Sequence, residues 1–216
     1  MATHSEGNGS VLEDCTDLDG GPPRAHARAL ARHHRAVAAG LVAAAVGATL
    51  AWVVQPVRVS SDSMTPTLTS GEHVLLLKQP WAGPVARGDV VVLDGTSWAQ
   101  AAAAAVAAGG ADGLSPDRVD AAVRTVRGTS LVKRVVGVAG DTVELDDGAL
   151  VVNGRLVVEP FVDLESVDGV WFGPVTVPTD AVFVMGDARA SSIDSRDLGV
   201  ARLDAVEGRV VSPLRR

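Results

Sequence analysis

One uncharged, apolar stretch limits what this chain can fold into. Residues 36–54 form a run of 19 without a charge and with a single Thr, which is long enough to cross roughly 30 Å of hydrocarbon as a helix. We therefore expect a tail at 1–35, a transmembrane helix at 36–54 and a folded domain at 55–216. A cleavable secretory signal is the alternative, but the apolar run exceeds the usual length of about 7–15 residues for such a signal.

The tail at 1–35 is rich in Gly, Pro, Asp, Glu, Arg and His and shows almost no apolar periodicity, so we expect it to be disordered. After the span, Arg58 is the only Lys or Arg in the next 20 residues. The arginines that come before it are Arg24, Arg28, Arg32 and Arg35. The positive-inside rule predicts a single-pass protein of the cytoplasmic membrane, with the tail in the cytoplasm and the domain outside.

Charge and cysteine content exclude several classes of function. The chain carries a formal net charge of −7 with a pI near 5.1, so we expect no binding to nucleic acid phosphates. A single cysteine, Cys15, excludes an internal disulfide and a cysteine-based metal site. Four of the five histidines lie in the tail, leaving His73 alone beyond it. We therefore expect no metal and no cofactor.

Short runs rich in Val and Leu, separated by Gly, Asp and Pro, make up most of the chain after the span. This pattern predicts a mostly β domain, and Asp147-Gly148 and Asn153-Gly154 are typical of two-residue hairpin turns. The predicted strands are 73–78, 89–93, 131–138, 142–145, 150–152, 156–158, 181–185 and 209–211. An Ala-rich insertion at 95–128 interrupts them, with short helices predicted at 98–108 and 116–126. We expect this insertion to be a surface excursion without a catalytic role.

A serine close to the span is a candidate nucleophile, provided that a base activates it. Ser63 has three candidate bases beyond the tail: His73, Lys78 and Lys133. Lysine acts as a base only when burial lowers its pKa from about 10.4. Lys133 lies in a Val-rich strand, where alternation places it on one face with Leu131 and Val135. Lys78 is typical of a surface lysine at a strand end, and a Ser-His-Asp triad with His73 stays open.

Four segments, taken in order, resemble the successive motifs of type I signal peptidases, which are membrane-anchored Ser-Lys proteases. The segments are Ser61-x-Ser63-Met64-x-Pro66-Thr67-Leu68, Arg87-Gly88-Asp89-Val90-Val91-Val92, Lys133-Arg134-Val135-Val136-Gly137-x-x-Gly140-Asp141, and Gly186-Asp187-x-x-x-x-Ser192-x-Asp194-Ser195-Arg196. The resemblance runs from about Trp52 to the C-terminus, apart from the insertion. It implies an antiparallel β domain after one transmembrane helix.

The resemblance also implies a role for individual residues. Ser63 is expected to be the nucleophile and Lys133 the general base, and Ser61 matches the hydroxyl of the oxyanion hole. Ser192 matches the serine that orients the lysine. Charged residues expected to give structural support are Arg134, Asp187, Asp194 and Arg196. Residues that match the wall of the pocket for the small side chain before the cut are Val59, Met64, Leu68 and Val132.

The implied activity is removal of signal peptides from secreted preproteins after Ala-x-Ala-like sites. The implied partners are these signal peptides and the lipid bilayer, with the export translocon left open as a third. Two residues depart from the family pattern. Ala188 stands where Asn is usual, and Asp62 stands where a small residue is frequent. A Ser-Lys maturation peptidase with narrow substrates is one alternative. A catalytically silent, membrane-anchored peptide-binding protein is another, and Ala188 is the only feature that favours it. Self-cleaving repressors share this chemistry, but they carry a DNA-binding domain in place of a membrane span.

Overall fold

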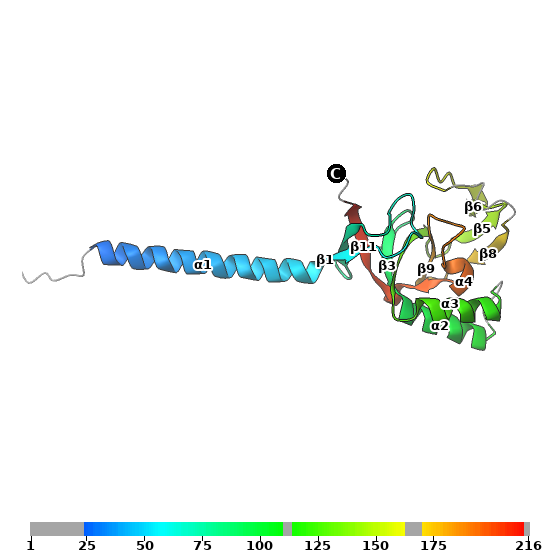
Figure 1. Ribbon diagram of the computed structural model, residues 1–216, viewed down its shortest axis with the longest axis horizontal. Coiled ribbons are helices and arrows are strands. Elements are labelled where there is room, and N and C mark those ends of the chain that lie inside the picture. The colour runs from blue at the N-terminus through cyan, green and yellow to red at the C-terminus, as the bar shows by residue number, and fades with distance from the viewer. Residues whose placement is uncertain (1–23, 110–113, 163–169, 214–216) are drawn as a thin grey trace, which may run out of the picture. The chain divides into compact units, whose positions relative to one another are not determined.

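The structure is a computed structural model that describes residues 24–109, 114–162 and 170–213 (Figure 1). It contains two compact units, Met1–Gly47 and Ala48–Arg216. The part of the predicted tail at 1–23 lies outside the described residues.

The first helix, α1 (Arg24–Val53), begins well before the predicted span. Residues 24–35 are therefore helical, although they were expected to belong to a disordered tail. The physical reason is local, because this segment is rich in Ala and Arg and contains neither Gly nor Pro. Within α1, Arg32–Val53 is long and apolar enough to cross a membrane. Apolar side chains such as Leu41 and Leu50 are exposed along it.

The second unit is mostly β and antiparallel, as the sequence predicts. Its larger sheet has seven strands in the order β1-β2-β11-β3-β4-β9-β10, and its smaller sheet has four in the order β7-β6-β5-β8 (Figure 1). The strands of the larger sheet are β1 (Val54–Arg58), β2 (His73–Lys78), β3 (Val90–Asp94), β4 (Ser130–Gly137), β9 (Ala181–Met185), β10 (Ala201–Arg202) and β11 (Val206–Pro213). Those of the smaller sheet are β5 (Thr142–Asp146), β6 (Ala149–Val152), β7 (Arg155–Leu156) and β8 (Phe172–Thr176).

The sequence patterns found the central strands but missed β1, β8 and β10. β1 follows α1 without a turn residue between them and contains Pro56, which argues against a central strand. Pro56 is tolerated because β1 lies at the edge of the sheet. β8 contains Gly173 and Pro174, which hide its apolar alternation. β10 has only two residues and therefore no period to detect.

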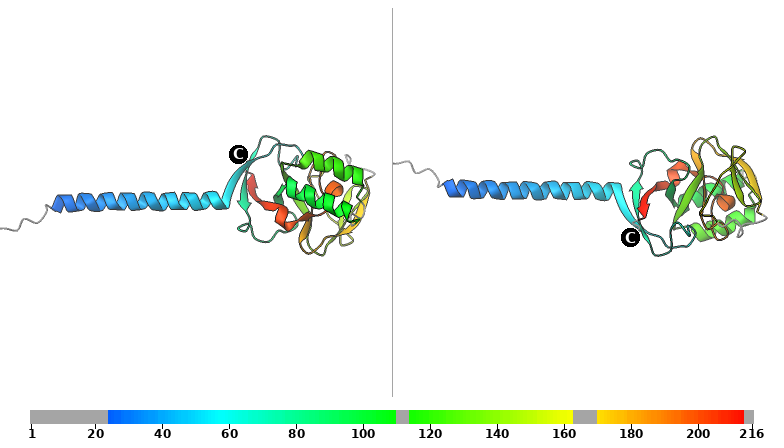
Figure 2. Two further views of the ribbon diagram at one scale, coloured as in Figure 1. Left: turned by 90° about the horizontal axis from the view of Figure 1, so that it is seen from below. Right: turned by 90° about the horizontal axis from the view of Figure 1, so that it is seen from above.

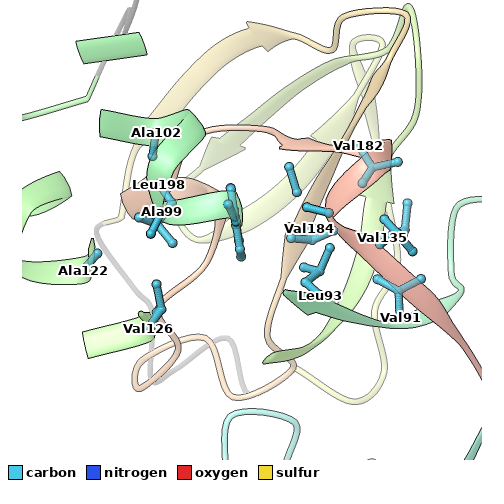
Figure 3. Close-up of a cluster of buried hydrophobic side chains, with 14 of the residues drawn as sticks. Val91, Leu93, Ala99, Ala102, Ala122, Val126, Val135, Val182, Val184 and Leu198 are labelled. Atoms are coloured by element: carbon cyan, nitrogen blue, oxygen red, sulfur yellow. The ribbon is translucent and has the colours of Figure 1, made fainter. Parts of the chain in front are cut away.

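Strand β9 separates two of the three hydrophobic clusters, because all five of its residues are buried. Val182 and Val184 pack on one side, in a cluster with residues of β3, β4 and the helices (Figure 3). Phe183 and Met185 pack on the other side, against the smaller sheet. A third cluster forms around Met64 beside β2. Burial on both faces explains why β9 is an uninterrupted apolar run in the sequence.

The Ala-rich insertion forms helices α2 (Gly95–Ala107) and α3 (Pro116–Val126), which lie side by side on one side of the domain (Figure 2). The expectation of a surface excursion is wrong. Trp98, Ala99 and Ala102 of α2 and Val119 and Ala122 of α3 belong to the main hydrophobic cluster. Small alanine side chains allow the helices to approach closely. Each alanine buries little apolar area, and the sequence of an Ala-rich helix therefore gives only a weak indication that the helix is buried.

Replacing Trp98 tests whether the insertion belongs to the cooperative core. Trp98 is 0% exposed, whereas Trp81 is 63% exposed and serves as the matched control. We expect Trp98→Ala to lower the free energy of unfolding by about 3–5 kcal/mol, because it leaves a cavity among packed side chains. Trp81→Ala should change it by less than about 0.5 kcal/mol. Chemical denaturation in detergent, followed by circular dichroism, measures both. Equal stability of the two variants would contradict a structural role for the insertion.

Candidate active site

The loop between β1 and β2 carries Ser61 and Ser63 close together. Their Oγ atoms lie 3.2 Å apart, so either hydroxyl can donate to the other. The backbone N–H of Thr65 donates to the carbonyl of Asp62 at 3.0 Å, which forms a turn around Ser63. The Asp62 side chain accepts a hydrogen bond from the Ser70 N–H at 3.1 Å. Asp62, which the family pattern left unexplained, therefore closes this loop.

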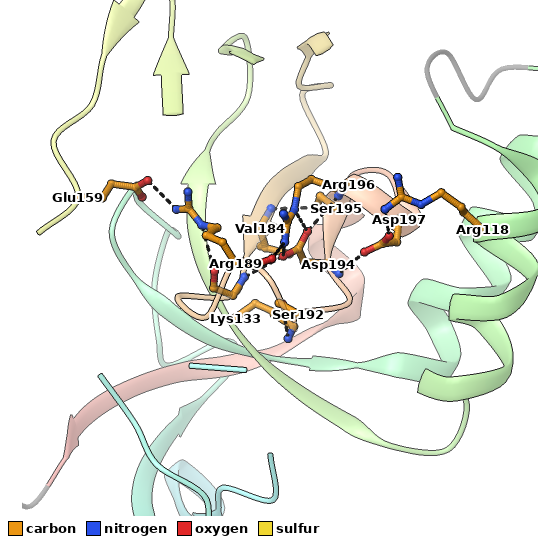
Figure 4. Close-up of polar contacts among 11 residues, drawn as sticks. Arg118, Lys133, Glu159, Val184, Arg189, Ser192, Asp194, Ser195, Arg196 and Asp197 are labelled. Atoms are coloured by element: carbon orange, nitrogen blue, oxygen red, sulfur yellow. Dashed lines mark hydrogen bonds and ion pairs between the residues drawn. The ribbon is translucent and has the colours of Figure 1, made fainter. Parts of the chain in front are cut away.

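Lys133 of β4 is buried, with 2% of its surface exposed. It lies on the same face as Leu131 and Val135, as strand alternation predicts, and both of these pack in the main cluster. Its Nζ donates to the Ser192 hydroxyl at 3.0 Å (Figure 4). Within the described chain it forms no ion pair. Burial lowers the pKa of Lys133 to about 8, although nearby Asp194 acts in the opposite direction. This lysine is neutral in a substantial fraction of molecules at mildly alkaline pH.

Gly186, directly after β9, lies beside both Ser63 and Ser192. A Cβ at this position would lie 2.5 Å from the Ser63 carbonyl oxygen and would overlap the Ser192 side chain. The Ser63 carbonyl also accepts the N–H of Ala188 at 3.1 Å. The Gly186–Ser192 segment thus joins the serine loop to the lysine. No direct hydrogen bond between Ser63 and Lys133 exists among the described residues.

The contact with Ala188 uses the backbone alone. The hydrogen bond from the Ala188 N–H to the Ser63 carbonyl therefore forms even though Ala188 lacks the side-chain amide that is usual in the family. His73 is exposed and forms no hydrogen bond with Ser63 in the described chain. Lys133 also has no direct hydrogen bond to Ser63, but it is buried and bonded to Ser192.

Two ion pairs lie near the lysine, and Figure 4 shows the first of them, between Asp194 and Arg196. The Asp194 carboxylate is buried and accepts Arg196 Nε and Nη2, each at 2.9 Å, together with the Gly186 N–H at 3.1 Å. Burial alone would raise the pKa of Asp194, but the Arg196 hydrogen bonds and charge hold it below the ordinary value. Arg134 binds both oxygens of buried Asp187, at 2.8 and 2.6 Å.

Several contacts in this region were not predicted from the sequence. Arg189 is buried and pairs with Glu159 at 2.6 Å, while its Nε donates to the Gly186 carbonyl at 3.1 Å. The Ser195 hydroxyl accepts the N–H of Val184 at 2.9 Å. Phe161 lies under Arg134, 4.2 Å from its guanidinium carbon. Arg189 lies inside the fourth motif, between Ala188 and Ala190, where no periodic pattern indicates a buried cation.

The four predicted pocket residues come together beside Ser63. Val59, Met64 and Leu68 are buried, and Val132 packs against them, half-buried. A cleft of about 410 Å³ adjoins them. Its lining consists of Val57, Arg58, Val59, Ser60, Ser61, Ser63, Met64, Thr129, Ser130, Leu131 and Val132. Leu68 lies behind Met64 and does not line the cleft.

One edge of β4 faces this cleft. β4 pairs with β3 from Ser130 to Arg134, but its pairing with β9 begins only at Arg134. Because backbone polar groups alternate in direction along an antiparallel strand, those of Ser130 and Val132 point away from β3. The site therefore offers an extended peptide an unpaired strand edge that leads to Ser63.

No group of three or more His, Cys, Asp and Glu side chains is arranged to hold a metal ion in the described part of the chain. Ser61 and Ser63 line the cleft, and Lys133 lies on the same strand as its wall residues Ser130, Leu131 and Val132. A serine hydroxyl and a buried lysine with a lowered pKa are groups that suit acyl transfer.

Comparisons with known proteins show the family to which the chain belongs. Residues 32–214 match the family model "Signal peptidase, peptidase S26". Signal peptidase I of Bacillus licheniformis is 34% identical over 164 residues, covering 71% of this chain and 72% of that protein. Signal peptidase I P of Bacillus subtilis subsp. natto is 32% identical over 167 residues, with coverages of 73% and 74%. A crystal structure of an Enterococcus faecalis signal peptidase I has a TM-score of 0.41 and 23% identity, covering 60% of this chain and 97% of that one. This chain belongs to the signal peptidase family, peptidase S26, and is a serine endopeptidase.

Proposed function

We propose that the protein is a membrane-bound signal peptidase I that removes signal peptides from exported preproteins through a Ser63–Lys133 dyad. The observation that carries the proposal is the state of Lys133. Its amine is buried, hydrogen-bonded to a neutral hydroxyl rather than to a carboxylate, and its pKa is lowered to about 8. A lysine in this state can accept a proton from a serine.

The proposed reaction begins when Ser63 Oγ attacks the scissile carbonyl and Lys133 Nζ takes the hydroxyl proton. The Ser61 hydroxyl and the Ser63 N–H stabilise the oxyanion that forms. When the intermediate collapses, Lys133 passes its proton to the leaving amine, and the signal peptide stays bound to Ser63 as an ester. Water, activated by the same lysine, then releases the peptide. Ser192 positions the amine, and Asp194, Arg196, Asp187 and Arg134 hold the surrounding backbone.

Recognition of the substrate follows from the cleft. An extended peptide would pair with the open edge of β4 and present its side chains to the cleft. Met64, Val59 and Val132 would form an apolar wall that favours a small residue such as Ala before the cut. The preproteins cleaved would then carry Ala-x-Ala-like sites, as the family resemblance implies.

The proposed location is the outer face of the cytoplasmic membrane. Arg32–Val53 would span the bilayer once, with the N-terminal tail in the cytoplasm, because its apolar length suffices and the preceding segment is rich in arginine. The folded unit begins at the end of this helix, so the site would be held near the bilayer from which signal peptides emerge. The partners would be lipids and signal peptides, with the translocon as a further candidate.

Removing either member of the dyad should abolish cleavage. We expect Ser63→Ala and Lys133→Ala to lower the cleavage rate of a preprotein in detergent by at least about 10³-fold, because the nucleophile or its base is lost. Lys78→Ala provides the matched control, since Lys78 lies at the end of β2 outside the site. Gel analysis of preprotein processing measures the rate. Cleavage at the wild-type rate by either dyad variant would rule out the mechanism.

Loss of the Ser61 hydroxyl should slow the reaction without abolishing it. We expect Ser61→Ala to lower kcat by about 10²-fold, with little change in KM, because an oxyanion donor acts mainly in the transition state. Ser61→Thr keeps a hydroxyl and should recover much of the activity. Steady-state kinetics with an Ala-x-Ala peptide distinguish these outcomes. A rise in KM alone would indicate that Ser61 binds the substrate instead.

The buried lysine should also reduce stability at neutral pH. Because the folded-state pKa of about 8 lies below the ordinary 10.5, the charged form is disfavoured by folding, and the full penalty applies below about pH 8. We expect Lys133→Met to raise the free energy of unfolding at pH 7 by on the order of 1–3 kcal/mol. The difference from wild type should shrink as the pH rises from 8 towards 10.5. Denaturation of both proteins across this range tests the sign, and a gain that grows with pH would contradict it.

A further inference from the structure

The segment that holds the lysine amine ends in a helix too short to be stable alone. Helix α4 (Ser195–Leu198) is a single turn, and a helix of this length is unstable without tertiary contacts. Its N-cap residue is Asp194, two residues after Ser192, so the position of α4 determines where the Ser192 hydroxyl lies. The contacts that fix α4 therefore matter for Lys133.

Part of this support comes from the capping box of α4 itself. The Asp194 N–H donates to Asp197 Oδ2 at 3.1 Å, while the Asp194 carboxylate accepts N–H groups of the first turn. The other oxygen of Asp197 binds Arg118 Nη2 of α3 at 2.5 Å (Figure 4). One carboxylate thus links the backbone of the lysine-holding segment to the Ala-rich insertion.

The insertion also packs directly against α4. Leu198 is 1% exposed and belongs to the same cluster as Trp98, Ala102 and Val119 of the insertion. Trp98 Nε1 donates to the carbonyl of Gly199, the residue that ends α4, at 3.3 Å. The two helices therefore hold α4 by apolar contact, by a backbone hydrogen bond and by one ion pair.

We propose that Arg118 is a positioning residue for Lys133: by binding Asp197, it fixes α4 and thereby the Ser192 segment that holds the lysine amine. The inference rests on the proposed role of Lys133 as the base. It assigns a role in catalysis to the insertion, acting at a distance from the substrate.

The charges around the Lys133 amine predict how the loss of Arg118 would change the pKa of Lys133. Asp194, Asp197 and Asp187 raise the pKa of Lys133, and Arg196 lowers it. Arg118 pairs with one of these carboxylates, so removing it leaves Asp197 uncompensated and favours the charged lysine. A lysine that must be neutral to act as a base would then require a higher pH.

The test is a pH–rate profile of the full chain in detergent with an Ala-x-Ala peptide substrate. We expect Arg118→Gln to move the acid limb of kcat/KM up by about 0.3 pH unit, which lowers the rate at pH 7 about twofold and leaves the alkaline plateau unchanged. Arg118→Lys should restore the profile, because it restores the ion pair with Asp197. Arg124→Gln on α3 is the matched control, because Arg124 is exposed and forms no ion pair in the described chain.

Superimposable profiles for Arg118→Gln and Arg124→Gln would overturn the proposal. A loss that is equal at every pH, and that Arg118→Lys does not repair, would overturn it as well, because general destabilisation would then explain the loss. Failure of the underlying function looks different. In that case Lys133→Ala would still cleave the peptide, whatever the Arg118 variants do.

Discussion

Much of this structure is arranged around an amine that is buried without a counter-charge. Lys133 lies on the face of β4 that it shares with Leu131 and Val135, which pack in the main hydrophobic cluster. An apolar residue would suit this position. A carboxylate at hydrogen-bond distance would stabilise the lysine, but it would also keep the amine charged and useless as a base. The structure instead provides the Ser192 hydroxyl, and it occupies the nearby carboxylates of Asp194 and Asp187 with arginines.

The carboxylates of Asp187 and Asp194 can be buried near Lys133 because each is paired with an arginine. A buried ion pair contributes little net stability, but removing one partner is strongly destabilising. The main contribution of Asp194 and Arg196 is therefore to hold the backbone from Gly186 onward in position, and their contribution to the net stability of the fold is small. That backbone contacts the Ser63 carbonyl on one side and holds Ser192 on the other. Ser63 and Lys133 thus keep their relative position through the Gly186–Ser192 segment.

The sequence predicted the parts of the fold that depend on regular alternation. The Val- and Leu-rich strands β2, β4 and β9 were found nearly at their bounds, and the face of Lys133 followed from the period of two. The motif resemblance also singled out Ser61, Ser63 and three apolar residues that line one cleft in the structure, Val59, Met64 and Val132. Burial of the insertion was not predicted, because alanines give a weak apolar signal. The pairing of Arg189 with Glu159 and the anchoring of α4 were missed, because loops of this kind have no period that relates sequence to contact.

Ala188, which departs from the family pattern, and Gly186 differ in how well their positions tolerate substitution. The contact made at this position is a hydrogen bond from the Ala188 N–H to the Ser63 carbonyl, and any residue other than proline provides that donor. Gly186 is different, because any side chain there would overlap Ser192 and crowd the Ser63 carbonyl. A substitution at 188 therefore changes one side chain and leaves the serine loop attached. A substitution at 186 would push the Ser63 carbonyl and the Ser192 side chain apart. The position of Ser63 relative to Ser192 and Lys133 therefore depends more on Gly186 than on Ala188.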